Sequence, residues 1–242
     1  MSRLSVLLCA LSIATVTCGH LCAQVYTLDK EDPGYMLLVS MYPEPYYGPL
    51  TELDYIEVAE ELGVEVPALK AVVEIETGAR HQGFWKDGKP LINFDLTMFR
   101  KMAQRNHVSL TSAQKTFPVI FSRPNISQYG SQQAAQQARL DAAMEVNELT
   151  AIQATFWGMF QIGGFNWKKC GAESAHDFVE RMSRSERDQL ELFAKFIINT
   201  GLVKHLAEKN WAAFARGYNG PGYARKGYHT RMANAYKKFK TS

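Results

Sequence analysis

Apolar residues recur at intervals of three and four along much of the chain, which is the spacing of one buried face of an α-helix. The first such segment begins at Thr51, a residue type that caps helices, and ends at Gly63. A second helix is predicted from the early proline Pro67 to about Thr77, with Gly78 ending it. Runs of β-branched residues in strict alternation are missing, so the pattern indicates a mainly α-helical protein.

The rest of the chain extends this pattern. After a short apolar run at Leu91–Phe94, the spacing predicts a helix through Met98 and Met102. Residues 105–131 are polar and are expected to form a loop, and residues 83–94 leave room for at most a small β-hairpin. Further helices are predicted over residues 131–148, 185–199, 202–218 and 223–238.

The first residues are typical of a signal peptide. Arg3 precedes an uncharged run, Leu4–Val16, that is shorter than the ~20 residues of a membrane-spanning helix, and Ala23 offers a cleavage point. We therefore expect residues 1–23 to direct export to the periplasm or out of the cell, with no stable membrane insertion after their removal. An uncleaved membrane anchor is the alternative.

The remaining chain is expected to have two parts. Residues 24–50 are rich in Pro, Tyr and Gly without a regular period, which indicates an extended lead-in segment, and residues 51–242 form the folded domain. Three of the four cysteines fall in the signal, so Cys170 is left without a partner for an intrachain disulfide or a cysteine-rich zinc site. The six histidines show no ligand spacing, and we expect neither a metal nor another cofactor.

Charge is nearly balanced overall but unevenly distributed. The formal net charge of +3 is too small for nucleic-acid binding by bulk charge, and we expect a monomer that binds no nucleic acid. Residues 29–65 contain ten acidic residues and one lysine, whereas residues 204–242 contain nine Lys/Arg and one acid. The basic end suits either an anionic polymer such as a cell wall or the solvated face of a helix.

Glu76 is the most informative candidate for chemistry. It follows Leu69, Val72 and Val73 on one helix face, so its carboxylate continues an apolar stripe. It also lies in the last helical turn, where the helix dipole disfavours negative charge, and both effects should raise its pKa. A carboxylic acid that stays protonated near neutral pH suits cleavage of a glycosidic bond, because the leaving oxygen needs a proton. A buried glutamate with a structural hydrogen bond is the alternative.

Two further segments combine amide and aromatic side chains. Gln161 lies among small and apolar residues in Gly158–Ile162, and Tyr218 and Asn219 end a helix before a Gly-Pro turn. Such groups suit a sugar-binding cleft, where hydroxyl and N-acetyl groups need donors, acceptors and ring contacts. Taken singly, each is more often a helix cap or a core residue.

Three motifs in this order resemble the lysozyme-like superfamily of goose-type lysozymes and lytic transglycosylases: Glu76-Thr77-Gly78, Gly158–Ile162 and Tyr218-Asn219-Gly220. The chain is more closely similar, over about residues 51–238, to the N-acetylmuramidase family of phage endolysins and bacterial wall-lytic proteins. This resemblance implies a lysozyme-like helical domain with peptidoglycan glycan strands as its partner. It rests on Gly83-Phe84, Ile92-Asn93-Phe94-Asp95, Phe156-Trp157-Gly158, Ser185-Glu186 and Asn219-Gly220-Pro221.

The resemblance also implies an activity, cleavage of the β-1,4 bond between N-acetylmuramic acid and N-acetylglucosamine. Glu76 takes the position of the family's catalytic glutamate, the general acid. Gln161, Tyr218 and Asn219 take the positions of its sugar-cleft residues. Asp95 stands where the family is expected to have a glutamate, and it is the candidate for activating the attacking water. Its alternative role is to cap or hydrogen-bond nearby backbone.

Three alternatives stay open at this point. If no second carboxylate reaches the site, attack by the muramyl 6-hydroxyl would give the 1,6-anhydro product of a lytic transglycosylase. A domain that keeps the fold without the chemistry would bind peptidoglycan and leave it intact. Finally, the same chemistry could serve remodelling of the cell's own wall or attack on other cells.

Overall fold

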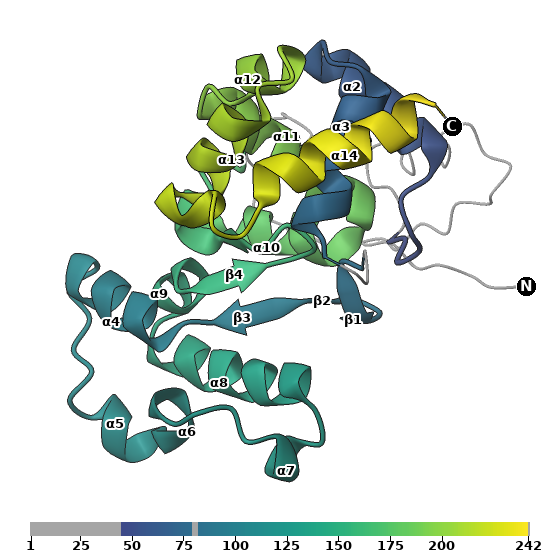
Figure 1. Cartoon of the computed structure of the whole chain (residues 1–242). Coiled ribbons are helices and arrows are strands. Elements are labelled where there is room, and N and C mark those ends of the chain that lie inside the picture. Colours follow the sequence, from purple (N-terminus) through teal and green to yellow (C-terminus); the bar gives the residue numbers. More distant parts are fainter. Residues whose placement is uncertain (1–44, 79–81, 242) are drawn as a thin grey trace, which may run out of the picture. The chain divides into compact units, whose positions relative to one another are not determined.

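The computed structural model describes residues 45–78 and 82–241, all of which belong to one unit of the chain, Pro45–Ser242 (Figure 1). The expected signal peptide, and residues 24–44 of the expected lead-in segment, lie outside the described residues. Within the described ranges, no helix is both long and apolar enough to cross a membrane.

The first two helices form as their sequence signals predict. Helix α2 (Glu52–Leu62) begins with a capping box, in which the Thr51 hydroxyl accepts from the Asp54 N–H and the Asp54 carboxylate accepts from the Thr51 N–H. It ends at Gly63, whose φ of 63° is a left-handed conformation that glycine adopts without strain. Helix α3 (Val66–Glu76) follows, with proline in its first turn.

The two small sheets are antiparallel. Strands β1 (Phe84–Lys86) and β2 (Lys89–Pro90) form the hairpin that the sequence predicted. Strand β3 (Ile92–Phe94) pairs with β4 (Thr155–Trp157), which pairs with β5 (Ile162–Gly163). This second sheet was not predicted, because strands of two and three residues are too short to show an alternating pattern.

The prediction of a loop over residues 105–131 was wrong. After α4 (Leu96–Arg105) the chain forms three single-turn helices, and Ile120 from the middle one is fully buried. Four-residue helices carry too little hydrophobic periodicity to be recognised among polar residues. They are α5 (Ala113–Thr116), α6 (Pro118–Phe121) and α7 (Ile126–Tyr129).

Helix α8 (Gln132–Val146) was predicted, but its polar residues do not all face solvent. Gln136 and Arg139 are buried against β3, which runs alongside α8 (Figure 1). The Arg139 guanidinium donates to the backbone oxygens of Phe94 and Ile120, both at 3.1 Å. These bonds pair part of a buried charged group and join β3, α6 and α8.

The remaining helices complete the domain, and two boundaries differ from expectation. The segment 202–218 is two helices, separated near Lys209, whose φ is 53°. The last helix begins at Tyr228, later than predicted, after a single 3-10 turn. The elements are α9 (Glu148–Gln153), η1 (Gly164–Asn166), α10 (Ala175–Arg184), α11 (Glu186–Asn199), α12 (Val203–Ala207), α13 (Trp211–Asn219), η2 (Pro221–Tyr223) and α14 (Tyr228–Lys240).

Helix α14 packs along α3 in the opposite direction. Near its C-terminal end, the Tyr236 hydroxyl donates to the Glu65 carboxylate at 2.8 Å, and Lys240 pairs with the same carboxylate. Glu65 caps the start of α3, so the start of α14 lies toward the end of α3 that carries Glu76. Figure 1 shows this crossing, with α14 in yellow and α3 in blue.

The core confirms the mainly α-helical class. Its largest fully buried side chains come from helices throughout the domain and include Leu69, Phe99, Phe178, Phe193 and Phe214. Burying a side chain of this size is worth roughly 1.5–3 kcal/mol each. Cys170 is also fully buried, and burial raises the pKa of its thiol to about 12, so the thiol stays uncharged within the core.

Candidate active site

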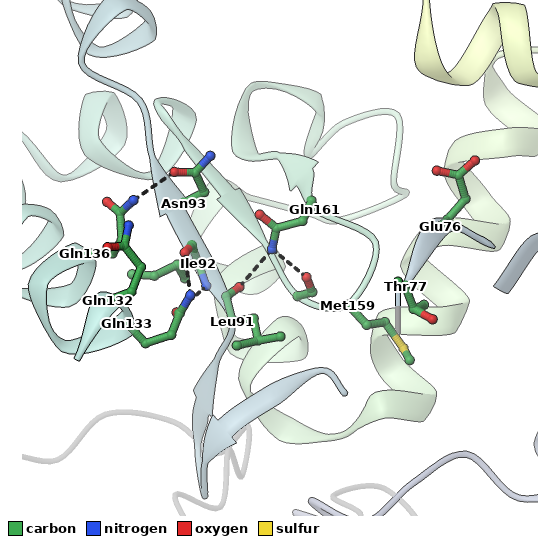
Figure 2. A pocket seen from close by; sticks show the side chains of 12 residues that line it. Glu76, Thr77, Leu91, Ile92, Asn93, Gln132, Gln133, Gln136, Met159 and Gln161 are labelled. Carbon is green, nitrogen blue, oxygen red and sulfur yellow. Dashed lines mark hydrogen bonds between the residues drawn. The ribbon is translucent and has the colours of Figure 1, made fainter. Parts of the chain in front are cut away.

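A cleft of about 380 Å³ opens between the end of α3 and the sheet (Figure 2). One side is formed by Glu76, Thr77 and Gly78, and the other by β3 and the first turns of α8. The turn between β4 and β5 forms the floor between them. The lining residues at β3, at α8 and at the β4–β5 turn are Leu91, Ile92, Asn93, Gln132, Gln133, Gln136, Gly158, Met159 and Gln161.

Glu76 is the last residue of α3, and its side chain behaves as the sequence predicted. Burial raises the pKa of its carboxyl to about 7. Two neighbours act in the opposite direction and lower that pKa: Asn219, whose Nδ2 donates to Glu76 Oε1 at 2.8 Å, and the positive charge of Arg231. Because burial outweighs both, the group holds its proton up to neutral pH.

Asn219, which donates to Glu76, and its neighbour Tyr218 are not among the residues that line the cleft. The Tyr218 hydroxyl donates to the Phe160 carbonyl at 3.1 Å, and its ring packs against Phe193 and Phe214. Burial raises the pKa of Tyr218 well above its usual value. In the structure Tyr218 packs against the core and Asn219 donates to the Glu76 carboxyl, and a direct contact between either residue and a sugar stays a prediction.

Gln161 does line the cleft, as the sequence motif suggested. Its backbone is in the left-handed region, with φ of 49°, at the turn between β4 and β5. Its Nε2 donates to the Gly158 carbonyl at 2.8 Å and approaches the Leu91 carbonyl at 3.4 Å, so the side chain ties this turn to the strand leading into β3 (Figure 2). A direct contact between Gln161 and a sugar stays a prediction.

Asp95 does not join the residues that line the cleft. It is the N-cap of α4, and its Oδ1 accepts the Met98 N–H at 2.7 Å. The backbone turns from β3 into α4 at this residue, which is why a capping side chain is needed here. The structure thus shows the alternative role that the sequence left open.

Amide side chains on α8 cover β3, and sequence reasoning missed them. Gln133 accepts from the Ile92 N–H at 3.0 Å and donates to the Ile92 carbonyl at 3.2 Å. Gln136, which is 4% exposed, donates to Asn93 Oδ1 at 2.9 Å. We call Asn93, Gln132, Gln133 and Gln136 the amide wall. The run of glutamines in 132–137 was the available signal, but a polar helix sequence does not show which of its glutamines are buried.

Helix α11 holds the two turns that flank the cleft, and this role was also missed. The buried Gln189 accepts from the Met159 N–H at 2.7 Å, and Glu186 accepts from the Gly83 N–H at 2.6 Å. A Cβ on Gly83 or Gly158 would come within 2.5 and 2.7 Å of Gln189 Oε1. Both glycines are therefore required by the close approach of Gln189.

The cleft contains few kinds of chemical group. Glu76 is its one carboxylate among the lining residues that the structure describes, and the rest are amides, apolar groups, a threonine and backbone. In the ranges 45–78 and 82–241, no three potential metal ligands of the His, Cys, Asp or Glu type lie together. The arrangement can deliver one proton beside a wall of hydrogen-bonding amides.

Comparison with known proteins gives a consistent result. The family model for N-acetylmuramidase matches residues 65–240. The crystal structure of Burkholderia AP3 phage endolysin is similar to this chain, with 31% sequence identity and a TM-score of 0.67, over 84% of this chain and 75% of that chain. No curated protein matches the chain.

Proposed function

The chain belongs to the N-acetylmuramidase family, and from that premise we propose that it cleaves the β-1,4 bond between N-acetylmuramic acid and N-acetylglucosamine. It is a glycoside hydrolase of lysozyme type, with peptidoglycan as its substrate. The observation that carries the proposal is Glu76, a half-buried acid with a pKa of about 7 at the edge of a polar cleft. Such a group can donate a proton where a glycosidic bond needs one.

Glu76 acts as the general acid in this proposal. Its protonated oxygen gives a proton to the bridging oxygen as the bond to the muramyl C1 breaks and positive charge develops on that ring. Asn219 holds the other oxygen through its Nδ2, which fixes the direction in which the acid points. Arg231 favours the carboxylate that remains after the transfer.

The cleft opposite Glu76 is proposed to hold the glycan. Asn93 and Gln132 are exposed and Gln161 lines the floor, so their amides can meet hydroxyl and N-acetyl groups. Tyr218 supports this arrangement indirectly, because its bond to the Phe160 carbonyl anchors the segment next to Gln161.

The second step decides between two products. In hydrolysis a water adds to the muramyl C1 and passes its proton to the Glu76 carboxylate, which restores the acid. The capping bond made by Asp95 argues against its activating that water. Since Glu76 is the single carboxylate among the described cleft residues, a second candidate is intramolecular attack by the muramyl 6-hydroxyl, which needs one acid that turns into a base.

The place of action is proposed on sequence grounds alone. A signal-like segment at residues 1–23 fits export to the periplasm or beyond, where peptidoglycan is found. Remodelling of the cell's own wall and attack on another cell use the same chemistry, so assays on both kinds of wall would separate them.

Product analysis tests the proposal. Purified peptidoglycan would be digested with residues 24–242, and the muropeptides analysed by mass spectrometry before and after borohydride reduction. Reducible muramic acid ends establish hydrolysis at the proposed bond, whereas non-reducible ends lighter by one water establish the anhydro-forming route. Reducible N-acetylglucosamine ends, or no products from the native chain with Glu76→Gln as the blank, would contradict the proposal.

A further inference from the structure

Some cations of the domain form ion pairs and others do not. Those on α3, α10 and α11 are paired with carboxylates, as are the two that meet Glu65. Arg225, Lys226 and Arg231 have no such ion pair among the described residues, and all three are exposed. We call these three residues the basic rim. The paired cations are Lys70, Arg181, Arg184, Arg187, Lys195, Lys209 and Lys240.

The sequence around the rim contains no acidic side chain. Glu208 precedes residues 209–242, which contain neither Asp nor Glu, and the two cations of this segment that are paired, Lys209 and Lys240, reach Glu65. An isolated cluster of like charges disfavours its own folding through repulsion. A cluster of this kind on an ordered segment is therefore positioned for an anion that comes from outside the chain.

The rim lies beside Glu76. Asn219, at the end of α13, donates to Glu76, and the next residues lead through η2 to the start of α14. Helix α14 runs antiparallel to α3 from that point, because its far end meets Glu65 at the start of α3. Helix α3 runs for eleven residues, about 16 Å, from Glu65 to Glu76, so the first turn of α14 lies toward the end of α3 that carries Glu76.

The segment that carries the rim is held in place. Gly220 and Gly227 take left-handed φ values of 75° and 66° at its two ends, and the Tyr223 ring meets His229 edge-on at 5.4 Å. Arg231 lies over the Tyr228 ring, 5.9 Å from its centre. The charge of Arg231 also lowers the pKa of Glu76, which is consistent with a short distance between the two groups.

Resting on the proposed function, we propose that the basic rim binds carboxylates of the peptide attached to muramic acid next to the cleaved bond. Muramic acid carries this peptide on its lactyl group, and the free carboxylates of the peptide lie several bonds away from the sugar. We assign contacts with the glycan to the neutral amide wall. Among the described residues, the rim then supplies the only cationic contacts that we assign to the substrate. The enzyme should therefore prefer peptide-bearing glycan strands to bare ones.

The test compares two double variants of residues 24–242. The rim variant is R225Q/K226Q, which leaves Arg231 in place because its charge acts on Glu76. The control is K101Q/K115Q, which removes the same charge from exposed positions elsewhere. Soluble glycan strands freed of anionic wall polymers would be used with their peptides or after an amidase has removed them. Work at pH 5, below the pKa of Glu76, keeps the acid protonated in every variant.

The proposal predicts a selective loss. The rim variant should lose roughly fivefold in kcat/KM on peptide-bearing strands, mainly through KM, because two exposed charge contacts are worth about 1 kcal/mol together. On bare strands, rim and control variants should each stay within about twofold of the native enzyme. Strands whose peptide carboxylates are amidated should make the native enzyme resemble the rim variant.

Other outcomes are equally clear. An equal loss on both substrates, or an equal loss in the control, would show attraction to the polymer by bulk charge and overturn the proposal. So would an unchanged rim variant, or a rim effect that appears only when phosphate-containing wall polymers are left on the strands. Thermal unfolding and the single variant R225Q guard against misfolding. A native enzyme that cuts neither substrate would instead contradict the proposed function.

Discussion

The two sides of the cleft use polar groups in opposite ways. On the α3 side, Glu76 is half-buried with one hydrogen-bonding amide, and its carboxyl is left with a raised pKa. On the α8 side, Gln136 is buried, but it bonds to Asn93 and to Arg139 in a connected network. Partial burial keeps a proton available on the first side, whereas a connected set of hydrogen bonds holds the second side in place.

Replacing the acid breaks the α3 side, with the largest expected effect. Glu76→Gln keeps an oxygen for the Asn219 amide but cannot donate a proton to the glycosidic oxygen, so kcat should fall about 10²–10⁴-fold. Initial rates on soluble glycan strands measure this loss. A variant that keeps a tenth or more of the native kcat would remove Glu76 from the chemistry.

The same variant should be more stable at alkaline pH. Folding raises the pKa of Glu76 from 4.5 to about 7, so ionisation of the folded protein costs free energy that is absent below pH 4.5 and complete above pH 7. The gain in the free energy of unfolding for Glu76→Gln should reach about 3 kcal/mol at most at pH 8 and vanish at pH 4. Urea unfolding at both pH values measures it, and a pH-independent difference would count against the raised pKa.

Breaking the amide wall should cost less, and mainly in binding and stability. Gln136→Ala leaves Asn93 and Arg139 each short of one buried partner, which should lower the free energy of unfolding by about 1–3 kcal/mol and raise KM several-fold. Gln137→Ala is the matched control, because the Gln137 side chain donates to Asp141 on the same helix and not to the amide wall. If both variants behave alike, the wall has no special role.

Removing the amide that supports the acid should shift the pH profile rather than abolish activity. The hydrogen bond from Asn219 lowers the pKa of Glu76, so Asn219→Ala should raise that pKa and move the alkaline limb of kcat/KM to higher pH. Arg231→Gln should shift the limb in the same direction, because its positive charge also lowers the pKa. A limb that stays in place or moves down would contradict these roles.

The smallest effect is expected at Asp95. Asparagine caps helices as well as aspartate does, so Asp95→Asn should keep both stability and activity, whereas Asp95→Ala should lose about 1 kcal/mol of the free energy of unfolding. Chemical denaturation and rate measurements on the two variants separate the roles. Loss of hydrolysis in Asp95→Asn with an unchanged fold would make Asp95 the water-activating carboxylate after all.

The sequence predicted those parts of the fold whose signals are local. The Thr51 cap, the Gly63 stop and the apolar stripe leading to Glu76 act within a few residues, and each was confirmed. The strand pair β3–β4 joins residues some sixty positions apart through three residues each, and no local pattern encodes it. The short helices around Ile120 were missed for a related reason. A helix of one turn is too short for its apolar residues to repeat at helical spacing.

The residues of the site show the same difference between local signals and long-range packing. The raised pKa of Glu76 follows from its own helix and could be predicted, but the partner that supports it lies 143 residues away. Gln161 carried a recognisable motif, whereas Gln136 and Gln189 were visible only once packing showed which glutamines are buried. Asp95 had two roles that the sequence could not separate, and the backbone geometry at the start of α4 separates them.

The most direct test of the central claim is the pH dependence of kcat/KM on soluble, peptide-bearing glycan strands between pH 4 and pH 10. A general acid whose burial raises its pKa to about 7 predicts a rate that falls with an apparent pKa near that value. A rate that stays level to pH 9, or that rises through neutrality, would contradict the assignment of Glu76 as the proton donor.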